Sequence, residues 1–173
     1  MVCETEINYV IWQNRSFRFY LASRLLYANE LYSPSAFCSI QAIETLMKAT
    51  LVYWDRSFNP ESMNHKIVGM INSIRNKVDK GKEFDCPKYF YMDKRFQSVT
   101  RYPDKNKGVM VPCTFLSDLD EMFCQLIEYV PFQFNTELSR TLLGKKKKNF
   151  DILKENNSQM ERLNQIFGLK SGG

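Results

Sequence analysis

The stretch SIQAIETLMKATLVYW, residues 39–54, decides the fold that we predict for this chain. Its apolar side chains recur at intervals of three and four residues, which is the spacing of one face of an α-helix. A proline at position 34 suits the first helical position, and Ser33 suits the N-cap before it. The pattern therefore predicts a long helix from Pro34 to about Trp54, largely packed against other elements.

The same spacing predicts further helices on both sides of this stretch, and no segment alternates in the way that a half-buried strand does. A short helical segment is expected after position 132. The long helices are predicted over residues 6–31, 60–78 (starting at Pro60 or only near Asn64), 114–130 and 150–167. The sequence predicts an all-α fold, an up-and-down bundle of four to five helices with an extra C-terminal helix.

Two parts of the chain differ in character. Residues 1–135 are expected to form the bundle, and residues 136–173 a C-terminal extension with an amphipathic helix. Lys145–Lys148 supply much of the net charge of +5, so the rest of the chain is close to neutral and does not predict a broad nucleic-acid-binding surface. We expect this run to be a solvated linker before the last helix, with attraction of RNA or an acidic partner as the alternative.

The composition, with 44% hydrophobic and 25% charged residues, is that of a globular protein. No apolar run is long enough to span a bilayer, and the N-terminus lacks the pattern of a secretory signal, so we expect no membrane contact and a cytoplasmic location. Five cysteines without a Cys-x-x-Cys pair argue against a disulfide framework or a zinc site. With one histidine and no Gly-rich phosphate loop, no metal and no cofactor are predicted.

Charged residues at two places in the predicted helices need an explanation. Asp118 and Asp120 suit the positive end of the helix at 114–130. Gln41, Glu44 and Lys48 fall within one narrow sector of the helix at 34–54, because successive residues are about 100° apart. Glu44 and Lys48 stand four apart with the acid first, which favours an ion pair. Two interpretations of this line stay open: a solvated outer face, or a line that faces a ligand.

Four features in a fixed order resemble a HEPN domain, a helical-bundle family of prokaryotes and higher eukaryotes. They are an alanine-containing first helix, a second helix of the form Ala…Gln-Ala-x-Glu-x-x-x-Lys, a His followed by aliphatic residues, and an Arg-Tyr-Pro-Asp loop. The resemblance covers about residues 14–130. The residues that carry it are Ala28, Ala36, Gln41, Ala42, Glu44, Lys48, His65, Ile67, Arg101, Tyr102, Pro103 and Asp104.

The resemblance implies a bundle that is often a homodimer and has a link to nucleotides or RNA. Many members are RNases or partners of nucleotidyltransferases in toxin–antitoxin and defence systems, and others are non-catalytic binding modules. RNase members carry an Arg followed by a His four to six residues later. Here His65 lies nine residues after Arg56, and no His follows Arg101. We therefore expect no catalytic residue and a non-catalytic module for a nucleotide, RNA or protein partner; the alternative is an RNase, or an RNase accessory, with a degenerate active site.

The Arg-Tyr-Pro-Asp loop supplies the best ligand candidates. The guanidinium of Arg101 offers a planar fork matched to phosphate, and Tyr102 can stack a base. Asp104 can orient Arg101 or accept a hydrogen bond from a base or ribose. Alternatively, the loop is a structural turn in which Arg101 pairs with Glu44. His65 is expected either to hydrogen-bond the backbone or a neighbouring helix, or to line a cleft beside Arg101. The expected ligand-binding residues are Arg101, Tyr102, Asp104, Lys48, Glu44 and His65.

Overall fold

The computed structural model describes residues 4–63, 65–78, 84, 86, 114–131, 133, 136–144 and 147–168. These residues form seven α-helices and no strand, which confirms the predicted all-α fold class. None of the described helices is long and apolar enough to cross a membrane. The helices are α1 (Glu4–Ala28), α2 (Tyr32–Trp54), α3 (Ile67–Lys77), α6 (Phe115–Ile127), α7 (Glu137–Gly144), α8 (Lys147–Lys154) and α9 (Met160–Ile166).

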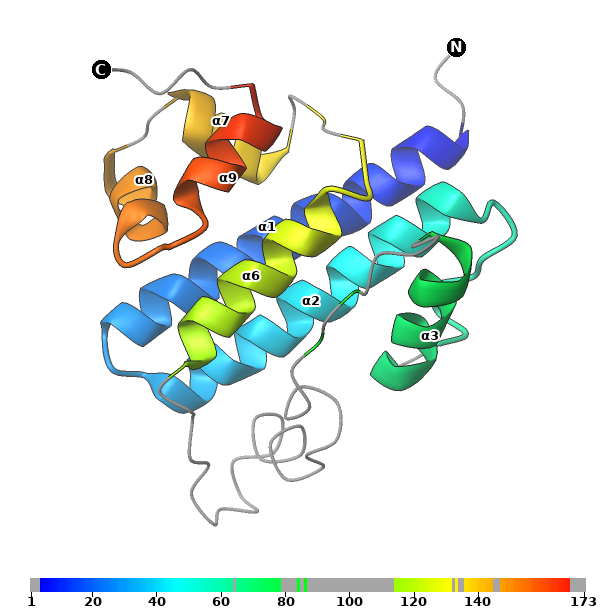
Figure 1. Cartoon of the computed structure of the whole chain (residues 1–173), viewed down its shortest axis with the longest axis horizontal. Helices are drawn as coiled ribbons and strands as arrows, with labels where there is room; N and C mark the ends of the chain where they lie inside the picture. Colours follow the sequence, from blue (N-terminus) through cyan, green and yellow to red (C-terminus); the bar gives the residue numbers. More distant parts are fainter. Residues whose placement is uncertain are drawn as a thin grey trace.

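The longest helices, α1 and α2, form an antiparallel hairpin, and α6 lies along it (Figure 1). Helix α3 packs against α2, whereas α7 and α8 pack against α1. Their shared core is rich in aromatic rings, and Tyr20 of α1 stacks on Phe123 of α6 with ring centroids 3.9 Å apart. The C-terminal segment adds buried side chains to this same core: Leu138, Leu142, Leu153, Leu163 and Phe167. The C-terminal segment is thus packed on the hairpin through apolar contacts.

The turn between α1 and α2 explains why the predicted cap at Ser33 is wrong. Glu30 has a left-handed backbone with φ of 60°, and the N–H of Leu31 donates to the carbonyl of Leu26 at 2.9 Å. This geometry closes α1 in the manner of a Schellman motif. The chain then enters α2 directly at Tyr32, two residues before Pro34, with Leu31 at the N-cap.

Helix α3 starts at Ile67, later than either predicted start. Side chains close local turns before it: the N–H of Ser57 donates to Asp55 at 3.0 Å, and the N–H of Glu61 donates to Asn59 at 2.9 Å. Such bonds offer the backbone an alternative to the helix. The predicted start at Pro60 is therefore wrong, and Asn64 lies outside the described residues.

The prediction of a single helix over residues 150–167 is wrong, because a non-helical segment separates α8 from α9. Asn156 has a left-handed backbone with φ of 49°, and the side chain of Asn157 accepts the N–H of Gln159 at 2.9 Å. Lys147 and Lys148 belong to α8, so the lysine run does not end before the helix as predicted. Residues 145 and 146 lie outside the described part of the chain.

Asp55, directly after α2, ties the end of this helix to α3. Its carboxylate accepts hydrogen bonds from Lys77, from the hydroxyl of Ser57 at 2.6 Å and from the N–H of Ser57 at 3.0 Å. The bond from Lys77, followed by those from Ser57, lowers the pKa of Asp55 from its ordinary value of 3.8 to about 2. These hydrogen bonds thus favour the ionised form of the Asp55 side chain in the folded protein.

This lowered pKa predicts an acid-sensitive contribution to stability. A carboxyl group with a lower pKa in the folded state stabilises the fold above its ordinary pKa and loses that effect as the pH falls through the folded value. Asp55→Asn should therefore be less stable than wild type at about pH 6, and the difference should narrow between about pH 4 and about pH 2. Urea unfolding of both proteins at these pH values measures the difference in stability. A difference that is the same at about pH 6 and at about pH 2 would contradict the lowered pKa of Asp55.

Candidate functional site

The polar line of α2 lies inside the protein. Gln41 is 9% exposed, Glu44 2% and Lys48 7%, so the interpretation as a solvated outer face is wrong. The reason is the position of α2, which contacts α1, α3 and α6 and has buried residues on nearly every side. The predicted ion pair is confirmed, with Lys48 Nζ 3.0 Å from Glu44 Oε1.

His65 joins this pair from the segment before α3. Its Nδ1 lies 3.0 Å from Glu44 Oε1 and 2.9 Å from Oε2, and its side chain is 55% exposed. This contact confirms that His65 hydrogen-bonds a neighbouring helix. Because an ionised carboxylate only accepts hydrogen bonds, Nδ1 carries the proton and Nε2 of a neutral ring is an acceptor. Glu44, Lys48 and His65, here called the Glu44 cluster, thus run from the core to the surface.

Aromatic rings of α1 lie beside the buried end of the cluster. Lys48 Nζ is 5.2 Å from the ring centroid of Trp12, and Cζ of Arg15 lies 6.0 Å from the same ring and 5.8 Å from that of Phe19. At these distances a cation is attracted to the face of an aromatic ring. The ammonium group of Lys48 is therefore compensated twice, by a carboxylate and by an indole.

The structure brings together only half of the predicted site. Glu44, Lys48 and His65 meet in one cluster, whereas Arg101, Tyr102 and Asp104 lie outside the described residues. The placement of these three residues, and the choice between a ligand loop and a structural turn, stay predictions.

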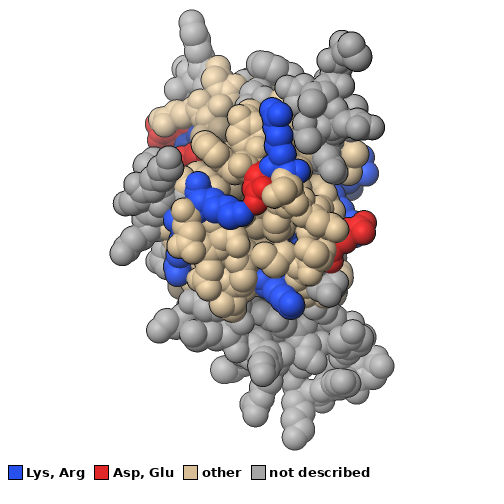
Figure 2. Space-filling model, turned by 90° about the vertical axis from the view of Figure 1, so that its right-hand side faces the viewer, with Lys and Arg blue, Asp and Glu red and all other residues tan. Residues whose placement is uncertain are grey.

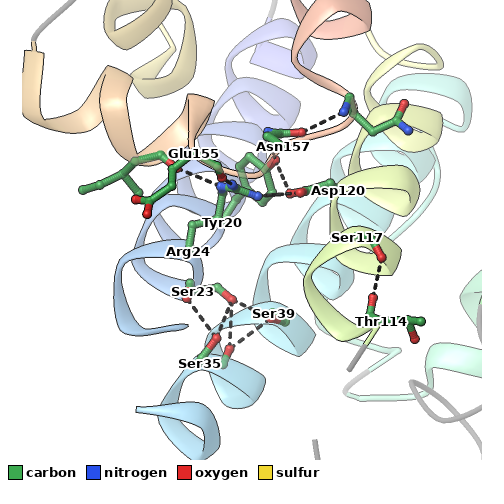
Figure 3. A network of polar contacts seen from close by, with 12 residues as sticks. Tyr20, Ser23, Arg24, Ser35, Ser39, Thr114, Ser117, Asp120, Glu155 and Asn157 are labelled. Atoms are coloured by element: carbon green, nitrogen blue, oxygen red, sulfur yellow. Dashed lines mark hydrogen bonds and ion pairs between the residues drawn. The ribbon is translucent and has the colours of Figure 1, made fainter. Parts of the chain in front are cut away.

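A second polar network, which the sequence does not predict, connects α1, α6 and the C-terminal segment (Figure 3). Arg24 Nη1 donates to both carboxylate oxygens of Asp120, at 2.6 Å and 2.5 Å, and both side chains are buried. Tyr20 also donates to Asp120, at 2.6 Å. The predicted role of Asp120 at the positive end of the helix is therefore wrong, because it turns inward to Arg24; Asp118 does lie in the first turn of α6.

Arg24 also holds the carboxyl end of α8. Its Nε donates to the carbonyl of Ile152 at 3.0 Å, and its Nη2 donates to the carbonyl of Glu155. Asn157 adds a bond to the hydroxyl of Tyr20 at 3.1 Å. A guanidinium at the C-terminus of a helix satisfies carbonyls that have no partner within the helix. The network thus docks the segment after α8 onto α1.

Burial governs the ionisation of this network. Removal from water raises the pKa of Asp120, while Arg24 and the hydrogen bond from Tyr20 oppose that rise. The pKa of Tyr20 is raised well above its ordinary value, first by burial and next by the neighbouring charge of Asp120. Tyr20 is therefore a donor throughout the physiological range.

A pocket of about 380 Å³ opens beside Arg24 between α1, α6 and α8. All three side-chain nitrogens of Arg24 already donate hydrogen bonds within the protein, so Arg24 stabilises the fold. The lining residues are Arg24, Tyr27, Ala28, Leu116, Ser117, Ile152, Glu155 and Asn156.

Charges of both signs are interspersed among uncharged residues on the end of the bundle near α3 (Figure 2). No broad basic field covers the described residues that this view shows. The described part of the chain also contains no group of three or more His, Cys, Asp or Glu residues arranged to hold a metal ion.

Comparison with protein-family models, with curated protein sequences and with solved structures found no match to this chain. The resemblance to HEPN domains stays a prediction from the sequence.

Proposed function

We propose that this chain is a non-catalytic, HEPN-like binding module that takes a phosphate-bearing ligand, a nucleotide or the end of an RNA, at the Glu44 cluster. Arg101, Tyr102 and Asp104 complete the site in this proposal. By the same resemblance, the module works as a homodimer, in the cytoplasm, beside a nucleotidyltransferase of a toxin–antitoxin or defence pair.

The observation that carries the proposal is the burial of Glu44 and Lys48 next to the exposed ring of His65. A buried ion pair adds little net stability compared with apolar side chains of the same size, and this pair, unlike Arg24–Asp120, is bonded to a half-exposed imidazole. The cluster also reaches the surface at His65, where a ligand has access.

The charges of the cluster favour an anionic ligand. The carboxylate of Glu44 is paired with two basic side chains, Lys48 and His65. The charges of Glu44 and Lys48 cancel, so the cluster has one net positive charge when the imidazole is protonated. A phosphate can accept a charge-assisted hydrogen bond from such a ring, and a guanidinium such as that of Arg101 can hold it with two parallel bonds. On the face that Figure 2 shows, the described residues do not form the continuous basic surface that a long nucleic acid needs.

Thermal unfolding with a panel of nucleotides and short RNAs tests the proposal. A ligand at about one hundred times its Kd adds about 2.7 kcal/mol to the stability of the folded state, which raises the Tm of a chain this size by about 5 °C or more. We expect such a rise for wild type and its loss in Arg101→Ala and His65→Ala.

Arg18→Ala is the matched control, because it removes a guanidinium whose side chain is 73% exposed on α1. It should keep the full ligand-induced rise. If no nucleotide or RNA raises the Tm of wild type, the proposal fails, and docking of a protein partner becomes the better explanation of the cluster.

One observation favours the alternative, an RNase with a degenerate active site. Nδ1 of His65 is bonded to a carboxylate, an arrangement that orients an imidazole for proton transfer through Nε2. In that case wild type should cleave members of an RNA panel, and both Arg101→Ala and His65→Ala should abolish cleavage. Binding without cleavage would instead support the non-catalytic module.

A further inference from the structure

A shallow groove of about 480 Å³ lies where three helices end, and none of its lining residues belongs to the Glu44 cluster. Trp54, the last residue of α2, is 53% exposed, and Tyr53 is 41% exposed. Exposed aromatic side chains gathered at a hollow mark interaction sites more often than isolated ones do. The groove is lined by Tyr53, Trp54, Ile127, Glu128, Tyr129, Val130, Pro131 and Ile166.

The aromatic rings of the groove are held in place before any partner arrives. The indole Nε1 of Trp54 donates to the carbonyl of Tyr129 at 2.7 Å. Tyr53 packs edge-on against Trp54, with ring centroids 5.6 Å apart, and also against Tyr9, at 5.2 Å. Rings fixed in this way lose little conformational freedom on binding, which favours affinity.

The electrostatics of the groove favour a cation. The lining includes the last residues of α2, α6 and α9, and the carbonyl end of a helix carries a partial negative charge. None of these three helices has a basic residue in its last turn to compensate that charge. Glu128 lines the groove and shares the guanidinium of Arg162 with Glu121, at 2.7 Å and 3.0 Å, so these three side chains together carry one net negative charge.

We infer that this groove is a docking site for an arginine-containing peptide segment of a partner protein. A guanidinium stacks on the face of an indole, and its planar donors match carbonyl and carboxylate oxygens. Trp54 supplies the exposed ring, and Glu128 together with the helix ends supplies the acceptors. This docking site is independent of the proposed nucleotide or RNA site.

The test uses the indole N–H signals of the full chain in a ¹H–¹⁵N spectrum, because the sequence contains only two tryptophans. The signal that disappears in Trp54→Phe belongs to Trp54. We expect it to shift saturably with a capped glycine peptide that carries two arginines, and the shift should shrink at high salt. The same peptide with citrulline, which keeps the shape and removes the charge, should leave the signal in place.

Variants then separate the two parts of the site. Isothermal titration calorimetry, which does not depend on the Trp54 signal, measures their affinities: Trp54→Ala should weaken binding of the arginine peptide about tenfold or more, as loss of a central aromatic does, and Glu128→Gln about two- to fivefold. Asp151→Asn removes an exposed acid of α8 that does not line the groove and should leave the affinity unchanged. Circular dichroism of each variant verifies that it is folded.

Three results would overturn the inference. The citrulline peptide could shift the Trp54 signal as strongly as the arginine peptide, which would mean a merely apolar contact. The arginine peptide could leave the signal unmoved at millimolar concentration. The signal could also move with protein concentration alone and be indifferent to peptide, which would assign the groove to an interface between copies of this chain.

Discussion

Replacing Arg24 by methionine is expected to lower the free energy of unfolding by about 3 to 5 kcal/mol, because it leaves the carboxylate of Asp120 buried without its cation. The substitution also removes the donors to the carbonyls of Ile152 and Glu155. Methionine fills a similar volume, so the loss reports mainly on charge and hydrogen bonding. Urea unfolding followed by circular dichroism measures the change.

A double variant separates the ion pair from the packing around it. Arg24→Met combined with Asp120→Leu removes both buried charges and should recover a large part of the stability lost in Arg24→Met alone. Arg18→Met is the exposed control and should change the unfolding free energy by no more than about 0.5 kcal/mol. If Arg24→Met costs no more than Arg18→Met, the network does not hold the fold as described.

The second large effect is expected at Glu44. Glu44→Leu should destabilise the protein by about 3 to 5 kcal/mol, because Lys48 then stays in the core without its carboxylate. The double variant with Lys48→Met should again recover much of the loss. Chemical denaturation in the absence of any ligand gives both values.

His65→Ala provides the comparison at the surface end of the same cluster. Its side chain is 55% exposed, so losing its contact with Glu44 should cost at most about 1 kcal/mol. This difference makes His65 the better position for functional tests, since a change in binding there is not masked by unfolding. A loss for His65→Ala as large as that for Glu44→Leu would show that the ring is part of the structural core.

The fold class was predictable because the apolar spacing of α2 and α6 is local and regular. Both helices bury the side chains that the pattern indicates, for example Ile40, Ile43 and Met47 on α2 and Leu119 and Phe123 on α6. The helix ends were less predictable. They depend on backbone geometry at single residues, such as the left-handed conformations of Glu30 and Asn156, which the side-chain pattern does not reveal.

The orientation of α1 shows why the Arg24 network escaped prediction. The apolar spacing of this segment predicts a buried face with Phe17, Leu21 and Leu25; Phe17 is buried, but Leu25 is 39% exposed. Besides Phe17 and Tyr20, the inward face carries polar side chains that bond to one another and to α2; Ser23, for example, contacts the hydroxyls of Ser35 and Ser39 at 3.1 Å and 2.6 Å. Hydropathy alone assigns such residues to the solvent side.

The candidate site was predictable in part for the same physical reason. Glu44 and Lys48 are four residues apart, so their pairing follows from helix geometry, whereas their burial depends on three other helices. Arg24 and Asp120 are 96 residues apart, and no local pattern connects them. A buried pair of this kind becomes visible only when the tertiary arrangement is known.

The bonds from Arg24 to the end of α8 have a consequence for biosynthesis. The guanidinium is made early, yet two of its acceptors follow it by 128 and 131 positions. A nascent chain in which only α1, α2 and α6 have emerged from the ribosome offers Arg24 its acceptor Asp120, but not yet the carbonyls of Ile152 and Glu155. The bonds from Arg24 to the end of α8 therefore form only after residues 152–155 have emerged, so this part of the network should be completed after the hairpin and α6 have met.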